Sequence, residues 1–306
     1  MKSRVVILGN GFDLNIGLPT SYRQFVESPE CNILTETSNN YLTNRIVNNY
    51  KLQGWVDVEE ELKVFAREKN GNTVFYKNKF ETEFNEIVGQ LRRYLEHVSQ
   101  DFKKYVRKNS LAADFLKVVD LYSSDFEIFS FNYTDLNSIK ATLGLSTFLR
   151  YRHVHGSISE KSIILGFEDN AESIEDFSFM IKTFNPNYTS HHLRQSLSQA
   201  DEIIFFGHSL GSTDYHYFAQ FFKEKSRPNL KKSESVKISF ITASNESHIA
   251  ILNQLRNMND ANTNLLFDQN DIEFYYTNDY RVKYKTHYLM RRLKLESEAD
   301  KIINKI

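Results

Sequence analysis

The chain has 306 residues, of which 41% are hydrophobic and 25% are charged, and its formal net charge is −1. This composition is typical of a globular protein long enough to bury a large core, in one large domain or two. The nearly balanced charge disfavours a general affinity for nucleic acid or for an anionic membrane, so neither is expected as a partner.

The cysteine and apolar content point to a cytoplasmic protein without membrane spans. Cys31 is the single cysteine, which excludes an internal disulfide and a cysteine-rich zinc site. No run of about 18 apolar residues occurs that could cross a bilayer. The apolar stretch at the start of the chain is too short for a signal peptide and leads straight into polar residues.

Short apolar runs rich in β-forming residues alternate with helical patterns along the chain. Because several runs are continuously apolar, we expect strands covered on both faces by helices, in a mostly parallel, Rossmann-like α/β sheet. The predicted strands are Arg4–Leu8, Phe126–Phe131, Tyr151–Val154, Ser162–Leu165, Glu202–Phe206, Val236–Thr242 and Ile272–Tyr276.

The long interval between the first two strands has helical periodicity instead. We interpret residues 39–123 as a helical insertion or subdomain within a single α/β domain spanning residues 1–306. A further helix should begin near Thr20 or Ser21, either of which can cap it. The clearest amphipathic pattern in the insertion is formed by Phe80, Phe84, Ile87, Val88, Leu91, Tyr94, Leu95 and Val98.

Four polar segments follow predicted strands: Gly9–Asp13, Asn132–Asp135, His153–Ser157 and Gly207–Gly211. In an open parallel sheet, ligands bind outside the carboxyl ends of the strands, where the connecting loops converge. If all four segments lie on that edge, they form one pocket.

The first segment has the glycines of a tight turn. Gly9 and Gly11 allow the backbone to approach a phosphate or a ribose, although a purely structural turn is an equally open interpretation. Leu14 stands where the dinucleotide fingerprint G-x-G-x-x-G has its third glycine, so this is not an ordinary Rossmann site.

Asn132 and His155 are the candidate catalytic residues. The amide of Asn132 can hold a water or a sugar hydroxyl, or it can cap a helix that starts near Asp135. His155 precedes Gly156 and can place a neutral imidazole in the pocket as a general base, or it can be structural. His153 lies on the same strand face, but no acidic cluster completes a ligand set, so no metal site is predicted.

Gly207–Gly211 also matches the hydrolase pattern G-x-S-x-G, with Ser209 as nucleophile. Asp271 or Asp279, followed by His287, could complete a triad in the required order. A nucleophile elbow needs a helix that starts at the serine, whereas the capping residues around Asp214 place the helix later. This alternative therefore ranks behind a nucleotide pocket.

Together these segments resemble the AbiH family of bacterial abortive-infection proteins, itself similar to the sirtuin-like nucleotide-binding superfamily. The resemblance rests on ILGNGFDLNIGLPTSY (Ile7–Tyr22), SFNYTD (Ser130–Asp135), HVHGS (His153–Ser157), FGHSLGSTDYHYF (Phe206–Phe218) and the W-x-D-x-E segment Trp55–Glu59.

The resemblance implies a sirtuin-like α/β fold, a role in anti-phage defence and an NAD pocket. Asn132 and His155 would flank the nicotinamide ribose. The residues implied for nucleotide binding are Gly9, Asn10, Gly11, Asp13, Ser21, Tyr133, Asp135, Gly207, His208, Ser209 and Asp214. Asn10 and Asp13 differ from the usual sirtuin loop, and Thr134 stands where many relatives have aspartate. With one cysteine, the chain lacks the zinc module of deacylating sirtuins, which argues against peptide deacylation.

The leading hypothesis is an NAD glycohydrolase that cleaves the nicotinamide–ribose bond of NAD or a related nucleotide. NAD is then the substrate, and no further cofactor is expected. Asn132 orients water or the ribose, His155 accepts a proton, and Asp13 binds a sugar hydroxyl or steadies the oxocarbenium-like transition state. A nucleotide-binding sensor that acts through a partner is the main alternative. A phage-derived or host activator and a homo-oligomer remain open.

Overall fold

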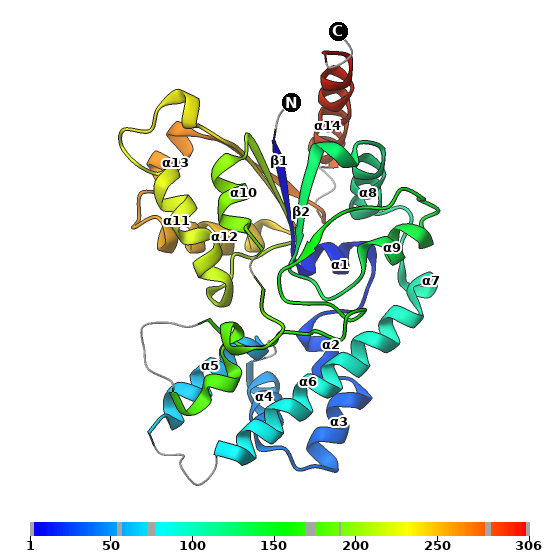
Figure 1. Ribbon diagram of the computed structural model, residues 1–306, viewed down its shortest axis with the longest axis vertical. Helices are drawn as coiled ribbons and strands as arrows, with labels where there is room; N and C mark the ends of the chain where they lie inside the picture. Colours follow the sequence, from blue (N-terminus) through cyan, green and yellow to red (C-terminus); the bar gives the residue numbers. More distant parts are fainter. Residues whose placement is uncertain are drawn as a thin grey trace. The chain divides into compact units, whose positions relative to one another are not determined.

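The computed structural model describes residues 3–53, 57–71, 77–168, 175–189, 191–278 and 283–303 (Figure 1). The chain forms two compact units. The first comprises Met1–Leu18, Phe102–Val154 and His191–Ile306, and the second comprises Pro19–Asp101 and His155–Ser190.

The first unit is built on a sheet of six parallel strands in the order β3-β2-β1-β4-β5-β6. This is the strand order of doubly wound Rossmann folds, so the predicted α/β class and parallel sheet are confirmed. The strands are β1 (Arg4–Leu8), β2 (Phe126–Ser130), β3 (Arg152–His153), β4 (Glu202–Phe206), β5 (Lys237–Thr242) and β6 (Asp271–Tyr276).

One predicted strand, Ser162–Leu165, is wrong: this segment is not a strand in the structure. Its backbone hydrogen bonds close locally, from Ser162 N to Ser157 O and from Ile164 N to His155 O. The turn at Gly156 (φ +74°) folds the segment back on itself. Its apolar side chains are buried in the second unit without a neighbouring strand.

Helices cover both faces of the sheet (Figure 1). On one face, Phe205, Phe240 and Phe274 stand in register on three adjacent strands, and their rings stack with centroids 4.9 Å apart at each step. Each buried phenylalanine contributes about 1.5–3 kcal/mol. This core is closed by α10 (Leu193–Gln199), α11 (Tyr215–Lys225), α12 (Asn245–Met258) and α13 (Thr263–Gln269).

The opposite face carries α1 (Asn10–Ile16) and α8 (Leu111–Leu121). Phe12 of α1 and Phe115 of α8 both meet Phe206 edge-on, at centroid distances of 5.2 and 5.6 Å. The short helices α7 (Phe102–Tyr105) and α9 (Leu136–Thr142) also belong to this unit.

A buried ion network anchors α14 (Lys283–Ile303) at the amino edge of the sheet. Arg4 is 1% exposed and donates to Glu202 over 3.2 Å and to Glu296 over 3.0 Å. Arg292 of α14 bonds to both of these carboxylates. The two cations and two anions neutralise one another, as buried charges require.

The second unit is mainly helical. Its longest helix is α6 (Lys77–Gln100), which buries Phe84, Ile87, Leu91, Leu95 and Val98 and thus confirms the predicted amphipathic helix. Ser21 caps α2 (Tyr22–Val26), as expected. The remaining helices of this unit are α3 (Pro29–Glu36), α4 (Tyr41–Gln53) and α5 (Val58–Lys69), with 3₁₀ turns at Glu175–Met180 and Lys182–Phe184.

The predicted helical stretch over residues 39–123 contains α4 to α8. Its status as an insertion within one domain stays a prediction. Within the described ranges, no helix has the length and apolar composition needed to cross a bilayer.

Candidate functional site

The carboxyl ends of β1, β2 and β4 define the candidate site. These three strands pair in register, so Leu8, Ser130 and Phe206 end at one level. The chain runs from β1 to β2 on one side and from β4 to β5 on the other, which makes the gap between β1 and β4 the topological switch point of the sheet. Ligands of doubly wound folds bind outside the strands at this place.

The glycine turn after β1 packs against the turn after β4. Gly11 N donates to Gly207 O over 2.9 Å, and Gly9 N donates to Phe206 O over 3.0 Å. A Cβ atom at Gly9 would lie 2.6 Å from Gly207 O, and one at Gly11 would lie 2.7 Å from Gly207 Cα. These glycines therefore allow two backbone turns to touch.

A helix that the sequence analysis did not foresee begins directly at this turn. Gly9 occupies the N-cap position of α1, and exposed Asn10 is its first residue. The turn is therefore one residue long. Since Gly11 N and Phe12 N already donate to backbone carbonyls, α1 does not present a free row of N–H groups.

Asp13, Asn132 and Thr134 form a buried hydrogen-bonded cluster beneath the glycine turn. Asp13 is 1% exposed. Its Oδ1 accepts from Asn132 Nδ2 over 2.8 Å, and its Oδ2 accepts from Thr134 Oγ1 over 2.7 Å. Asn132 Nδ2 also donates to Gly9 O over 3.1 Å. Asn132 thus fixes the β1 turn with both amide hydrogens, and Oδ1 is its remaining polar atom.

Asp135 caps α9, the role that the sequence analysis had considered for Asn132. Its carboxylate accepts from the backbone N–H groups of Asn137 and Ser138 and from the hydroxyl of Tyr151. Burial acts to raise the pKa of Asp135, but the hydrogen bonds from Ser138, Tyr151 and the backbone prevail and lower it. Tyr133 lies half-buried in the turn before this cap.

His208 holds the loop after β4. Its Nδ1 accepts from Leu210 N over 3.0 Å, so the proton of the neutral ring is on Nε2, which lies 3.4 Å from Asp214 Oδ2. The ring also meets Phe131 edge-on at 4.4 Å. His208 thereby supports the left-handed backbone at Leu210 (φ +55°).

Ser209 is exposed at the same loop, but the structure does not provide a nucleophile elbow. Helix α11 starts at Tyr215, as predicted, and both ring nitrogens of neighbouring His208 are engaged. Asp271 begins β6 and so lies at the amino edge, opposite Ser209. His287 is exposed on α14, and Asp279 lies outside the described residues.

His155 belongs to the second unit, where it is 5% exposed beside a buried ion pair. Lys182 Nζ lies 3.4 Å from His155 Nε2 and 3.0 Å from Glu59 Oε2. Glu59 Oε1 accepts from Gly166 N over 3.4 Å. Ser21 also belongs to this unit, and its hydroxyl accepts a hydrogen bond from Gln24 N in the capping box of α2.

Sequence reasoning missed Lys182 and gave Glu59 no role. Glu59 ends the W-x-D-x-E segment, in which Asp57 caps α5. A glutamate on the buried face of an amphipathic helix requires a cationic partner, and this was the available signal. Trp55 lies outside the described residues.

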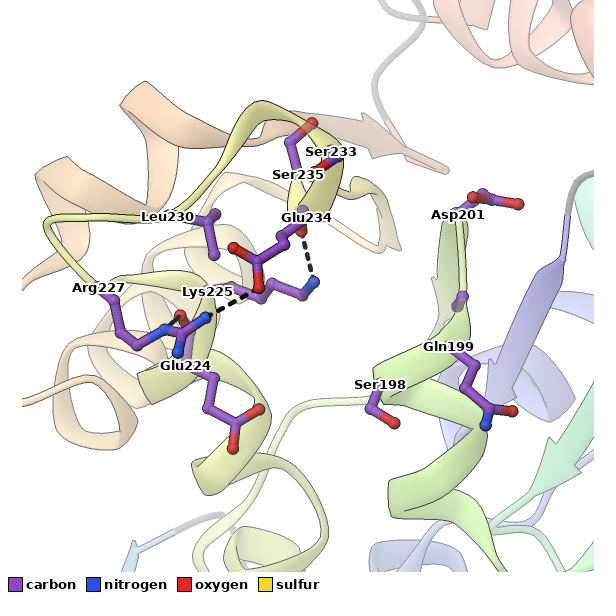
Figure 2. Close-up of a pocket in the computed structure, with 11 residues that line it drawn as sticks. Ser198, Gln199, Asp201, Glu224, Lys225, Arg227, Leu230, Ser233, Glu234 and Ser235 are labelled. Atoms are coloured by element: carbon purple, nitrogen blue, oxygen red, sulfur yellow. Dashed lines mark hydrogen bonds and ion pairs between the residues drawn. The ribbon is translucent and has the colours of Figure 1, made fainter.

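Two other features bear on ligand binding. Among the described residues, no group of three or more histidine, cysteine, aspartate or glutamate side chains could hold a metal ion. A polar pocket of about 260 Å³ lies before β4 and β5, at the amino edge, with Lys225 and Arg227 both bonded to Glu234 (Figure 2). It is remote from the polar segments at the carboxyl edge.

The family model described as "Bacteriophage abortive infection AbiH" matches residues 5–240. The chain belongs to the AbiH family. No curated protein and no solved structure matches it. Membership implies a bacterial role in abortive infection, whereas the relation to sirtuin-like proteins stays a prediction.

The AbiH match runs from the second residue of β1 into β5. It therefore covers the glycine turn, the Asp13 cluster, the His155–Lys182–Glu59 group and the loop of His208. It ends before β6 and α14. The AbiH region thus contains every residue named above for nucleotide binding or NAD hydrolysis, whereas the triad candidates Asp271, Asp279 and His287 lie beyond it.

Proposed function

We propose that this AbiH-family protein binds NAD or a related nucleotide at the carboxyl edge of its sheet and hydrolyses the nicotinamide–ribose bond during phage infection. The observation that carries the proposal is the β1/β4 switch point, flanked by polar segments after β1, β2 and β4. Doubly wound sheets with this strand order bind dinucleotides there.

The reaction makes limited demands on the protein. Nicotinamide leaves without being protonated, because its ring nitrogen already carries the positive charge in NAD. The protein must hold the ribose, place one water and exclude other nucleophiles. We assign Asn132 Oδ1 to orienting the ribose or the water. For His155 we keep the role of supplying an imidazole.

A nucleotide sensor without turnover is the second candidate, and one observation favours it. Both oxygens of Asp13 and both amide hydrogens of Asn132 are engaged in protein hydrogen bonds. Groups held in this way shape a pocket well but have little capacity left for chemistry. In this case NAD binds and nicotinamide is not released.

The decisive test combines calorimetry with chromatographic measurement of nicotinamide release by the purified full chain. We expect NAD to bind, and His155→Ala or Asn132→Ala to lower turnover at least about 100-fold. Ser209→Ala should weaken binding more than turnover. Asp271→Ala, at the opposite edge, is the control and should change neither.

Three outcomes would contradict parts of this proposal. Absence of NAD binding would exclude the pocket, and binding without nicotinamide release would favour the sensor. Equal turnover by the wild type and both catalytic variants would remove the roles assigned to Asn132 and His155. Labelling of Ser209 by a fluorophosphonate probe would revive the serine hydrolase.

A further inference from the structure

The second unit contains a charged group that the proposed reaction does not explain. Lys182 is completely buried and pairs with Glu59, which is 5% exposed, and Lys182 also contacts His155. Burying an ion pair is costly and contributes little net stability, so stability alone does not explain why this pair is present. The contact with His155 supplies a reason.

The direction of the Lys182–His155 contact fixes the state of the imidazole. An ammonium group can only donate hydrogen bonds, so His155 Nε2 must accept. A neutral imidazole that accepts at Nε2 carries its proton on Nδ1. Glu59 holds Lys182 in place through the 3.0 Å ion pair.

The position of Glu59 is itself well determined. Asp57 accepts from the N–H groups of Glu59 and Glu60 and so fixes the first turn of α5. The second oxygen of Glu59 is tied to Gly166 N. On the other side, a Cβ atom at Gly156 would lie 1.8 Å from Ser162 O, so the chain next to His155 also has little freedom.

We infer that Lys182 and Glu59 are positioning residues that hold His155 as the neutral Nδ1–H tautomer. His155 then acts as a hydrogen-bond donor toward ribose or water, in place of the proton acceptor expected from the sequence. This inference rests on the proposed function in assigning His155 to the site. The tautomer itself is a property of the ligand-free protein.

The test is the ¹⁵N NMR spectrum of the full chain with labelled histidines, recorded near neutral pH without ligand. The chain has nine histidines, and His155 is identified by the signals missing from His155→Gln. We expect the shifts of a neutral ring protonated on Nδ1. A ring protonated on Nε2, or a charged ring, would overturn the inference.

Two variants test the source of this state. Glu59→Gln with Lys182→Met removes both charges together and leaves no uncompensated ion, so this double variant is expected to fold. It should lose the Nδ1–H preference of His155. An unchanged tautomer would contradict the inference. If the double variant does not fold, the wild-type spectrum decides the question.

Lys140→Met is the matched control. Lys140 is 1% exposed and pairs with Asp120 over 2.6 Å in the first unit. Its replacement should lower stability while leaving the His155 signals unchanged.

Turnover gives an independent readout that separates this inference from the proposed function. We expect the double variant to lower kcat roughly 10–100-fold, as loss of a supporting shell does, with little change in KM. An unchanged kcat in an active protein would contradict the positioning role. If the wild type releases no nicotinamide, the proposed function fails, while the NMR result still decides the tautomer.

Discussion

At the carboxyl edge of the sheet, individual residues of the polar segments after β1, β2 and β4 have structural roles. Gly9, Gly11 and Gly207 let two turns meet backbone to backbone. Asp13 then holds the segment after β2 in place, because its carboxylate accepts hydrogen bonds from Asn132 and Thr134. The segments that resemble ligand-binding motifs thus have a structural task before any ligand enters.

Gly207→Ala should lower the free energy of unfolding by about 3 kcal/mol or more. Gly207 has φ +66°, and a Cβ atom there would lie 2.2 Å from Phe12 N. Strain and a backbone clash therefore add. Gly89→Ala is the matched control: Gly89 lies in α6, and a Cβ atom there would meet nothing within 4 Å, so alanine should stabilise by about 0.5–1 kcal/mol. Equal effects of the two changes in denaturant unfolding would contradict this account.

Asp13→Ala should cost about 2–4 kcal/mol of unfolding free energy, because two buried donors lose their shared acceptor. Asp114→Ala is the control. It breaks an exposed pair with Lys117 and should change stability by less than about 0.5 kcal/mol. If Asp13→Ala weakened NAD binding at unchanged stability, Asp13 would be a ligand contact and not an organiser of the turn.

At the scale of elements, the ends of helices are held by polar contacts that differ in burial. Helix α14 is anchored through the network of Arg4, Glu202, Arg292 and Glu296. Helix α9 begins at the Asp135 cap. The ion network of α14 is buried, whereas the Asp135 cap of α9 is partly exposed. We therefore expect the network to respond to loss of a counter-charge and the cap to respond to pH.

Glu202→Gln should lower the free energy of unfolding by about 3–5 kcal/mol, because Arg4 and Arg292 lose a buried counter-charge. The Glu202 side chain is 2% exposed, whereas that of Glu296 is 28% exposed. Glu296→Gln should therefore cost about 1 kcal/mol or less. Equal losses in urea unfolding would show that burial does not govern this network.

The Asp135 cap predicts a pH dependence with a defined sign. Because the folded protein lowers the pKa of Asp135, the carboxylate stabilises the fold above its unfolded pKa. That contribution is lost as pH falls through the lower, folded value. The stability difference between wild type and Asp135→Ala should be constant near neutral pH and shrink below about pH 4. A difference that grows on acidification would contradict the cap.

At the scale of the whole molecule, the sequence predicted the sheet better than the site. Continuous apolar runs such as Ile203–Phe206 of β4 directly indicate strands buried on both faces. Ser162–Leu165 is similarly apolar, but its backbone forms local hydrogen bonds after the turn at Gly156. Composition does not encode which segment an apolar run will pair with.

The sequence predicts which residues belong to the candidate site, but it does not predict which of them contact one another. Asn132 and Asp13 were named, but their hydrogen bond joins residues 119 positions apart and depends on the pairing of β1 with β2. Lys182 escaped notice because its partners, Glu59 and His155, are distant in sequence and no motif surrounds it. Motifs in the sequence thus identify the site residues, whereas the hydrogen-bond partners of these residues become known only from the fold.

We propose that this AbiH-family protein cleaves NAD when a phage infects the cell. The most direct measurement is the NAD content of infected cells that contain equal amounts of the wild-type chain or of His155→Ala. We expect the NAD content to collapse after infection only in cells with the wild-type chain. Unchanged NAD in wild-type cells that are nonetheless protected would contradict it.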